Sequence, residues 1–142
     1  MPTHIHLLLK QLIDNGISRY MKNLLDSYSK YFNIKHKRKG PLWESRFKNV
    51  LVKTDEQLLH LTRYLHLNPV TAYLVNSPED WDYSSYGQYL DSKIDYPFCD
   101  FSDVLKINPE EYEKFVNDRI DYQRSLAKIK ELIIEDEDIE IK

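Results

Sequence analysis

Apolar residues recur every three or four positions over residues 17–36, and this spacing predicts an amphipathic helix. The dipeptide Asn15-Gly16 just before the repeat is a turn signal, and either Asn15 or Ser18 is expected to cap the first helical turn. A charged loop follows the helix and closes at Gly40-Pro41. The apolar face of this helix consists of Ile17, Tyr20, Met21, Leu24, Leu25, Tyr28, Tyr31 and Phe32.

A second helix is predicted from Thr54 onward. Thr54 with Gln57 three positions later is a capping-box pattern, in which the side chains satisfy free backbone N–H groups at the helix start. Pro69 has no backbone N–H, so it is expected to stop or kink this helix at about Asn68. The apolar face of the helix consists of Leu58, Leu61 and Leu65.

Two short segments favour extended structure. His4–Leu9 is predicted as a short buried strand, because two histidines run directly into three leucines. Phe47–Val52 is predicted as a second strand from its aromatic and β-branched residues. Two strands are too few for an independent sheet, so we expect their partner to come from another chain or from an upstream segment.

The character of the chain changes at about Asp91. Residues 110–134 predict one long or broken helix, with Asn108 as its cap and Pro109 at its first position. We expect residues 91–142 to form a helical extension with an acidic tail, which packs on the preceding domain, binds a partner or shields a basic face.

The formal net charge of −3 hides an asymmetry. Residues 1–75 carry 12 Lys+Arg against 5 Asp+Glu, whereas residues 76–142 carry 8 against 18. The first half therefore suits a polyanion and the second half does not. Because lysine and arginine attract nucleic acid without regard to its sequence, this asymmetry alone is only a weak indication of DNA binding.

Composition excludes several classes of protein. A chain of 142 residues with 42% hydrophobic residues can bury the core of one ordinary domain. With Cys99 as its only cysteine, it has neither an internal disulfide nor a cysteine-rich zinc site. No apolar run approaches the length of a membrane span, and no signal segment precedes the first motif, so we expect a cytoplasmic protein without membrane contact.

His4 and His6 are the first candidates for chemistry. On a strand, residues two apart point to the same face, so two neutral imidazoles could hold one divalent ion. For an isolated pair, solvent-facing or hydrogen-bonded core histidines are the better interpretation. Neither a cysteine nor a third histidine lies nearby in the sequence to complete a structural zinc site.

The second helix carries a further group of candidates. His60, Tyr64 and Asn68 are four residues apart and share one helical face, whereas His66 points elsewhere and is expected to be structural. A tyrosine hydroxyl becomes a useful nucleophile when the electrophile is already polarised, as a metal-bound phosphodiester is. The competing interpretation is that Tyr64 is simply one of 11 tyrosines and packs against the helix.

Four segments that follow one another in the sequence favour a chemical role for the histidine pair and Tyr64 over a structural one. They are MPTHIHLLL, GPLWESRFKNVLV, RYLHLNPVTAYLV and WDYSSY, and together they cover about residues 1–90. Their order and content closely resemble the REP-associated tyrosine transposases, which belong to the HUH single-tyrosine (insertion-sequence 200-like) transposase superfamily. A histidine–hydrophobic–histidine segment alone would be weak evidence, whereas the four blocks in order are specific.

The resemblance implies a metal-dependent enzyme that cleaves single-stranded DNA and transfers the strand. Tyr64 matches the nucleophile that forms a 5′-phosphotyrosine link. His4 and His6 match the metal-binding histidines, and Asn68 matches the polar position that completes the site for Mg²⁺ or Mn²⁺. The implied substrate is single-stranded DNA folded into hairpins. The alternative is a catalytically impaired transposase remnant that only binds such hairpins.

The resemblance also implies an α+β, ferredoxin-like catalytic domain over residues 1–90, followed by the helical region 91–142. In that family a strand, a helix and a strand normally precede the histidine motif, so we expect this chain to hold a truncated domain with few strands. Position 3 is Thr, where the family usually has Asn. An exposed sheet edge would favour pairing with a second copy of the chain.

Basic and aromatic residues near these motifs are candidates for DNA contact. A basic loop follows the first helix, and further cations lie beside the second and third motifs. The unpaired bases of the DNA could stack on Tyr31, Trp43 or Phe47, although core packing is the favoured interpretation for Trp43 and Phe47. The predicted DNA-binding residues are Lys35, Lys37, Arg38, Lys39, Arg46, Lys48 and Arg63.

Overall fold

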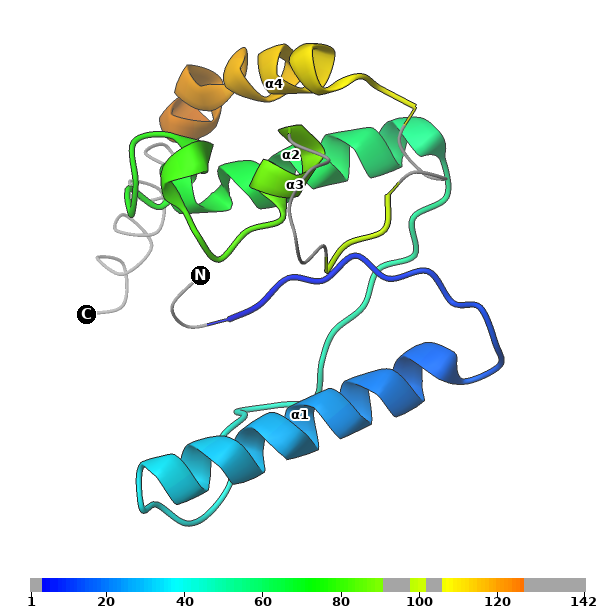
Figure 1. Ribbon diagram of the computed structural model, residues 1–142, viewed down its shortest axis with the longest axis vertical. Helices are drawn as coiled ribbons and strands as arrows, with labels where there is room; N and C mark the ends of the chain where they lie inside the picture. Colours follow the sequence, from blue (N-terminus) through cyan, green and yellow to red (C-terminus); the bar gives the residue numbers. More distant parts are fainter. Residues whose placement is uncertain (1–3, 91–97, 102–105, 127–142) are drawn as a thin grey trace, which may run out of the picture. The chain divides into compact units, whose positions relative to one another are not determined.

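The computed structural model describes residues 4–90, 98–101 and 106–126, and the regular secondary structure among them is helical (Figure 1). The helices are α1 (Gly16–Lys35), α2 (Asp55–Thr71), the 3₁₀ turn η1 (Pro78–Asp80), α3 (Tyr86–Leu90) and α4 (Pro109–Asn117). The chain divides into two compact units. We call Leu7–Leu51 the α1 unit, and Met1–His6 together with Val52–Lys142 the core unit.

The prediction of an α+β, ferredoxin-like domain is wrong for the described residues, which contain no strand. His4–Leu9 and Phe47–Val52 both lack regular secondary structure, and the side chains of Leu7 and Val50 are exposed. A strand exists only through hydrogen bonds to a neighbouring strand, and a local pattern cannot supply that neighbour. The sheet edge through which we expected a second copy to pair is accordingly not found in residues 4–90 either.

Helix α1 forms as its periodicity predicts. Asn15 precedes it in a left-handed conformation, with φ of 57°, and its carbonyl accepts a hydrogen bond from the Arg19 N–H at 3.0 Å. The Trp43 indole N–H donates to the Leu25 carbonyl at 3.3 Å, and the Trp43 ring lies 5.8 Å from the Tyr28 ring. Trp43 therefore holds the segment after the charged loop against α1.

Helix α2 begins at the predicted cap but runs past the predicted stop. The Thr54 hydroxyl accepts the Gln57 N–H at 3.1 Å, and the Gln57 side-chain oxygen accepts the Lys53 N–H at 2.9 Å. The helix continues through the buried Pro69 to Thr71. Pro69 removes one backbone donor, but later donors still find upstream carbonyls, since the Ala72 N–H bonds to the Asn68 carbonyl at 3.0 Å.

Helix α4 confirms the predicted cap and the broken form of the last helix. The Asn108 side chain accepts the Glu111 N–H at 2.8 Å, and Pro109 occupies the first turn. The helix ends at Asn117, and residues 120–126 are helical again after a two-residue turn. The remainder of the predicted helix lies outside the described residues. Within the described ranges, no helix is both long enough and apolar enough to cross a membrane.

The core unit is built around residues from three helices. Leu67 of α2, Tyr86 of α3, and Tyr112 and Val116 of α4 are each at most 1% exposed and form one apolar cluster. Tyr86 is thus a structural anchor of this core. The arrangement also shows that α4 packs on the domain, which was one of the three roles expected for the region after Asp91.

His66 lies buried inside this core and confirms its predicted structural role. Its Nδ1 is 2.7 Å from the Tyr112 hydroxyl, and its Nε2 is 2.9 Å from the Ser85 hydroxyl. Its ring also meets the ring of Tyr89 edge-on at 4.8 Å. Burial lowers the pKa of His66 from 6.5 to about 4, so the ring is neutral at physiological pH and can donate at one nitrogen while accepting at the other.

The buried imidazole predicts acid sensitivity. The folded protein resists protonating His66 until about pH 4, whereas the unfolded chain takes up that proton near pH 6.5. The free energy of unfolding should therefore be fully maintained above pH 6.5 and should fall as the pH drops toward 4, at up to about 1.4 kcal/mol per pH unit. Chemical denaturation at a series of pH values measures this slope.

Two variants isolate the contribution of His66. His66→Gln retains a donor and an acceptor but cannot titrate, so its slope over this pH range should be shallower than that of the natural chain. His36→Gln removes an exposed histidine and should leave the slope unchanged. Equal slopes for the natural chain and His66→Gln would contradict the assignment.

Candidate functional site

Tyr64 lies on the outward side of α2. Thr62, His66 and Leu67 of the same helix are buried, and the helical period turns Tyr64 away from them, leaving its side chain 47% exposed. Its side chain is thus accessible from solvent, as a nucleophile acting on a polymer must be.

The histidine pair lies beside Tyr64 within the core unit. The rings of His4 and His6 are 4.9 Å apart and nearly perpendicular, and the His6 ring is 6.4 Å from the Tyr64 ring. These residues come from segments far apart in the sequence. The structure therefore brings together three of the four residues that the sequence proposed for chemistry.

The protonation state of His6 suits metal binding. Partial burial lowers the pKa of His6 below its usual value of 6.5, and the neighbouring His4 lowers it further. The lowered pKa keeps the His6 ring neutral at physiological pH, and a neutral imidazole is the form that coordinates a metal ion.

Asn68 is the fourth candidate and lies one turn after Tyr64 on α2, half-buried. Its backbone carbonyl is used by the Ala72 N–H, which leaves its side-chain amide as the group available for a ligand. Within the described ranges, no group of three His, Cys, Asp or Glu side chains could hold a metal. The candidate donors for an ion are therefore the imidazoles of His4 and His6, with the amide of Asn68 as a third candidate.

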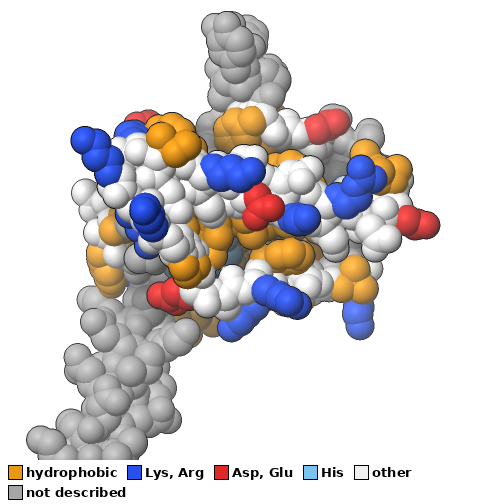
Figure 2. Space-filling model, turned by 90° about the horizontal axis from the view of Figure 1, so that it is seen from below, with side chains coloured by type: hydrophobic (Ala, Val, Ile, Leu, Met, Phe, Trp, Pro, Cys, Tyr) orange, Lys and Arg blue, Asp and Glu red, His pale blue; other side chains and the backbone are white. Residues whose placement is uncertain are grey.

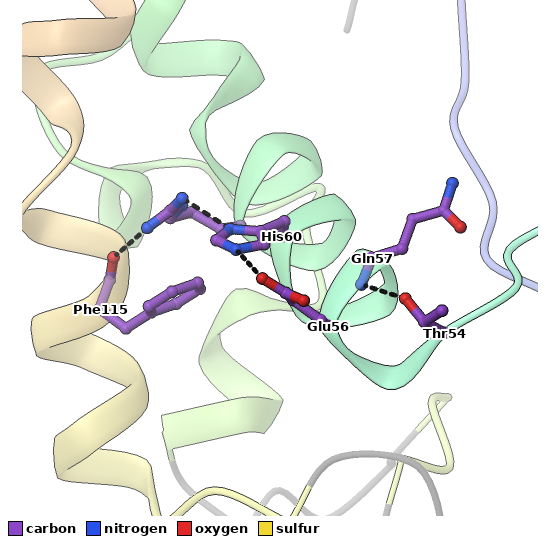
Figure 3. A network of polar contacts seen from close by, with 6 residues as sticks. Thr54, Glu56, Gln57, His60 and Phe115 are labelled. Atoms are coloured by element: carbon purple, nitrogen blue, oxygen red, sulfur yellow. Dashed lines mark hydrogen bonds and ion pairs between the residues drawn. The ribbon is translucent and has the colours of Figure 1, made fainter.

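His60 shares the helical stripe of Tyr64 but has its own partners (Figure 3). Its Nδ1 is 2.8 Å from an Arg63 guanidinium nitrogen, and its Nε2 is 4.0 Å from a carboxylate oxygen of Glu56. Its ring also lies 5.6 Å from that of Phe115. His60 is thus part of a contact between α2 and α4.

Arg63 has a structural contact that the sequence did not predict. Its guanidinium donates to the Phe115 carbonyl at 3.3 Å and lies 4.0 Å from the centre of the Phe115 ring (Figure 3). Burial lowers the pKa of Arg63, and the nearby Arg119 lowers it further, although a guanidinium stays charged at any physiological pH. Arg63 therefore joins α2 to α4.

The other predicted DNA-binding residues belong to the α1 unit. Residues 7–51 carry 10 Lys+Arg against 3 Asp+Glu, a net charge of +7. On the face shown in Figure 2, Lys and Arg side chains outnumber Asp and Glu and lie among apolar groups. The predicted DNA-binding residues of the α1 unit lie at the end of α1, in the loop after it and beyond that loop. They are Lys35, Lys37, Arg38, Lys39, Arg46 and Lys48.

Two of these cations, one at the end of α1 and one in the loop after it, are held by local contacts. The Lys35 ammonium donates to the Tyr31 hydroxyl at 3.1 Å, and this hydrogen bond raises the pKa of Lys35. The Arg38 guanidinium donates to the Pro41 carbonyl at 3.1 Å and lies 5.8 Å from the centre of the Phe32 ring. Both side chains remain exposed, so these contacts orient the charges without removing them from solvent.

Comparison with known proteins finds a relative of this chain. A Haemophilus influenzae protein, whose name places it provisionally among the REP-associated tyrosine transposases, is 32% identical over 107 residues. The match covers 68% of this chain, and the chain spans 60% of the length of that relative. No protein-family profile matches the chain. No solved structure matches it either.

The contacts of Arg63 predict a loss of stability when it is replaced. Arg63→Gln removes the guanidinium that joins α2 to Phe115, and we expect the free energy of unfolding to fall by about 1–2 kcal/mol. Arg46→Gln, which removes an exposed arginine of the α1 unit, should change it by less than about 0.5 kcal/mol. Thermal or chemical denaturation measures both, and equal stability of the two variants would show that the contact contributes nothing.

Proposed function

We propose that the chain is a REP-associated tyrosine transposase that cleaves single-stranded DNA and rejoins it through Tyr64. Three observations support this proposal. The sequence motifs resemble that family, a relative bearing the family name is 32% identical, and His6 lies 6.4 Å from Tyr64, ring to ring. The proximity of His6 to Tyr64 carries the proposal, because a nucleophile and a metal ligand must meet for this chemistry.

The proposed reaction exchanges one phosphodiester for another. The Tyr64 hydroxyl oxygen attacks the scissile phosphorus and loses its proton, while the bond from phosphorus to the DNA 3′ oxygen breaks. The departing 3′ oxygen takes up a proton, and the 5′ phosphate stays attached to Tyr64. A second DNA 3′-OH reverses the step and restores the tyrosine. The number of phosphate ester bonds is unchanged, so the reaction needs no ATP.

The chain's own donors suit a divalent ion at this place. His4 and His6 would hold it through their imidazoles, with the amide oxygen of Asn68 as a further ligand. When bound, Mg²⁺ or Mn²⁺ would polarise the scissile phosphate and stabilise the charge that develops on it. Because imidazole ligands suit transition metals better than they suit Mg²⁺, the donor set favours Mn²⁺.

The α1 unit would supply most of the attraction to DNA. Its net charge of +7 favours a polyanion, and its exposed aromatic side chains suit unpaired bases. We therefore propose single-stranded DNA, including DNA hairpins, as the substrate, and the cytoplasm as the place of action. The alternative is a remnant that binds hairpins without cleaving them. It is supported by the finding that, within the described ranges, no group of three or more His, Cys, Asp or Glu side chains could hold a metal.

The first test is formation of a covalent adduct. The full chain incubated with single-stranded hairpin DNA and Mn²⁺ should give a protein–DNA species that survives denaturing electrophoresis. Tyr64→Phe should abolish this species, because the attacking oxygen is gone. Tyr73→Phe, a matched control that removes the hydroxyl of another half-exposed tyrosine, should retain it.

The outcomes separate the two functions. An adduct that forms equally well with Tyr64→Phe would overturn the choice of nucleophile. A chain that shifts hairpin DNA in a native gel but forms no adduct with any ion would be the binding remnant. Whether the chain cleaves DNA or only binds it, the gel shift should weaken steeply with salt, because phosphate contacts dominate such binding.

The second test concerns the ion. Adduct yield should be higher with Mn²⁺ than with Mg²⁺ at equal concentration, and His6→Ala should lower it by at least about tenfold, as loss of a ligand or its support commonly does. Calorimetric titration of DNA-free protein with Mn²⁺ gives a readout independent of activity, in which His6→Ala should bind more weakly than the natural chain. His36→Ala serves as the control. Unchanged Mn²⁺ affinity in His6→Ala would remove His6 from the metal site.

A further inference from the structure

The α1 unit contains an open hollow of about 430 Å³. Two aromatic side chains, Trp43 and Phe47, line it together with the charged residues Lys22, Asp26 and Arg46. Its volume falls within the range of roughly 300–1,000 Å³ that is typical of small-ligand sites. Five of its seven lining residues therefore carry large aromatic or charged side chains.

The aromatic part of the hollow is fixed on one side and open on the other. Trp43 is held by its hydrogen bond to the Leu25 carbonyl, at 3.3 Å, and by its contact with the Tyr28 ring. Phe47, in contrast, is 40% exposed even though it is a large apolar side chain. The favoured prediction that Phe47 packs in a core is therefore wrong, and its ring remains available for a flat partner.

The charged part of the hollow indicates what kind of flat partner fits. Lys22 and Arg46 are exposed cations, and they belong to a unit with a net charge of +7. Asp26 adds a carboxylate that can only accept hydrogen bonds. An unpaired nucleotide matches all three features, since it has a flat face for the aromatic rings, N–H groups for the carboxylate and phosphates for the cations.

We propose that this hollow binds one unpaired nucleobase of the single-stranded DNA. The base stacks against Trp43 and Phe47, and the phosphates on either side of it lie near Lys22 and Arg46. The inference rests on the proposed function, because it takes single-stranded DNA as the substrate. The site lies outside the residues assigned to cleavage and outside the basic loop. It combines Trp43, Phe47 and Arg46, which the sequence offered as separate candidates for DNA contact, in one hollow with Lys22 and Asp26.

A charged loop alone would bind DNA through phosphates and would not distinguish a strand with bases from one without. Base stacking adds an attraction that depends on the base itself, worth roughly five- to 150-fold in affinity for each stacked base. The hollow therefore predicts a preference for intact DNA over abasic DNA, and this preference should depend on Phe47.

The experiment uses the two tryptophans of the chain. In Trp81→Phe, Trp43 is the only indole, so its fluorescence reports on the hollow alone. Titration with a short single-stranded oligonucleotide should quench this emission. An oligonucleotide of the same length with abasic sites throughout carries the same phosphates and should quench it much less.

Affinity measurements on variants complete the test. Phe47→Ala, in the full chain, should bind the intact oligonucleotide about tenfold more weakly and the abasic one equally well. Phe98→Ala, which removes an exposed phenylalanine of the core unit, should change neither affinity. Lys22→Gln should weaken binding of both oligonucleotides and lower their dependence on salt.

The possible failures are distinguishable. If the chain binds intact and abasic DNA equally and Phe47→Ala has no effect, the hollow is not a base site, although the chain still binds DNA and Tyr64 can still cleave it. Unchanged Trp43 emission on saturation with DNA would also overturn the proposal. If no oligonucleotide binds at all, both the base site and the proposed function fail.

Discussion

The core unit depends on the burial of a neutral histidine between three helices. His66 of α2 reaches the Tyr112 hydroxyl on α4 and the Ser85 hydroxyl just before α3, so one side chain connects three separate parts of the chain. A buried polar group without partners would cost several kcal/mol, and the two hydroxyls remove most of that cost. Burial also lowers the pKa of the ring to about 4, so the ring can take up a proton only at the expense of the stability of the core.

This constraint also determines what α2 presents to solvent. Once His66 and Leu67 face the core, the helical period places Tyr64 on the outside, where it is 47% exposed. Arg63, which directly precedes Tyr64, contacts Phe115 and so fixes the same helix against α4. The candidate nucleophile therefore lies on a helix whose rotation about its axis is fixed by contacts on both sides of Tyr64 in the sequence. A nucleophile needs such a rigid support, because small displacements greatly reduce reaction rates.

The features predicted correctly from the sequence were local ones. The starts of α2 and α4 depend on Thr54 and Asn108, whose partners are only three residues away, so a short motif contains all the information. The strands failed for the opposite reason, since the pattern of His4–Leu9 cannot specify a neighbouring strand. The contact of Arg63 with Phe115 spans the distance between two helices, and no local signal could have indicated it. The meeting of His6 and Tyr64 was likewise available only from the resemblance to a family.

The net charge of −3 is the sum of two opposite charge excesses, one in each unit. The α1 unit has an excess of seven positive charges and the core unit an excess of ten negative charges, so the averaged value describes neither unit.

Positive charge attracts DNA over distances of about a Debye length, roughly 8 Å at physiological salt, and requires no precise geometry. Covalent chemistry at a phosphate requires precise geometry and a neutral imidazole to bind a cation. Under the proposed function the two requirements would fall to different residues, because the histidine pair and Tyr64 belong to the core unit and most of the lysines near the motifs belong to the α1 unit. The proposed function therefore implies that a substitution in one set would change DNA affinity while leaving the proposed reacting groups intact.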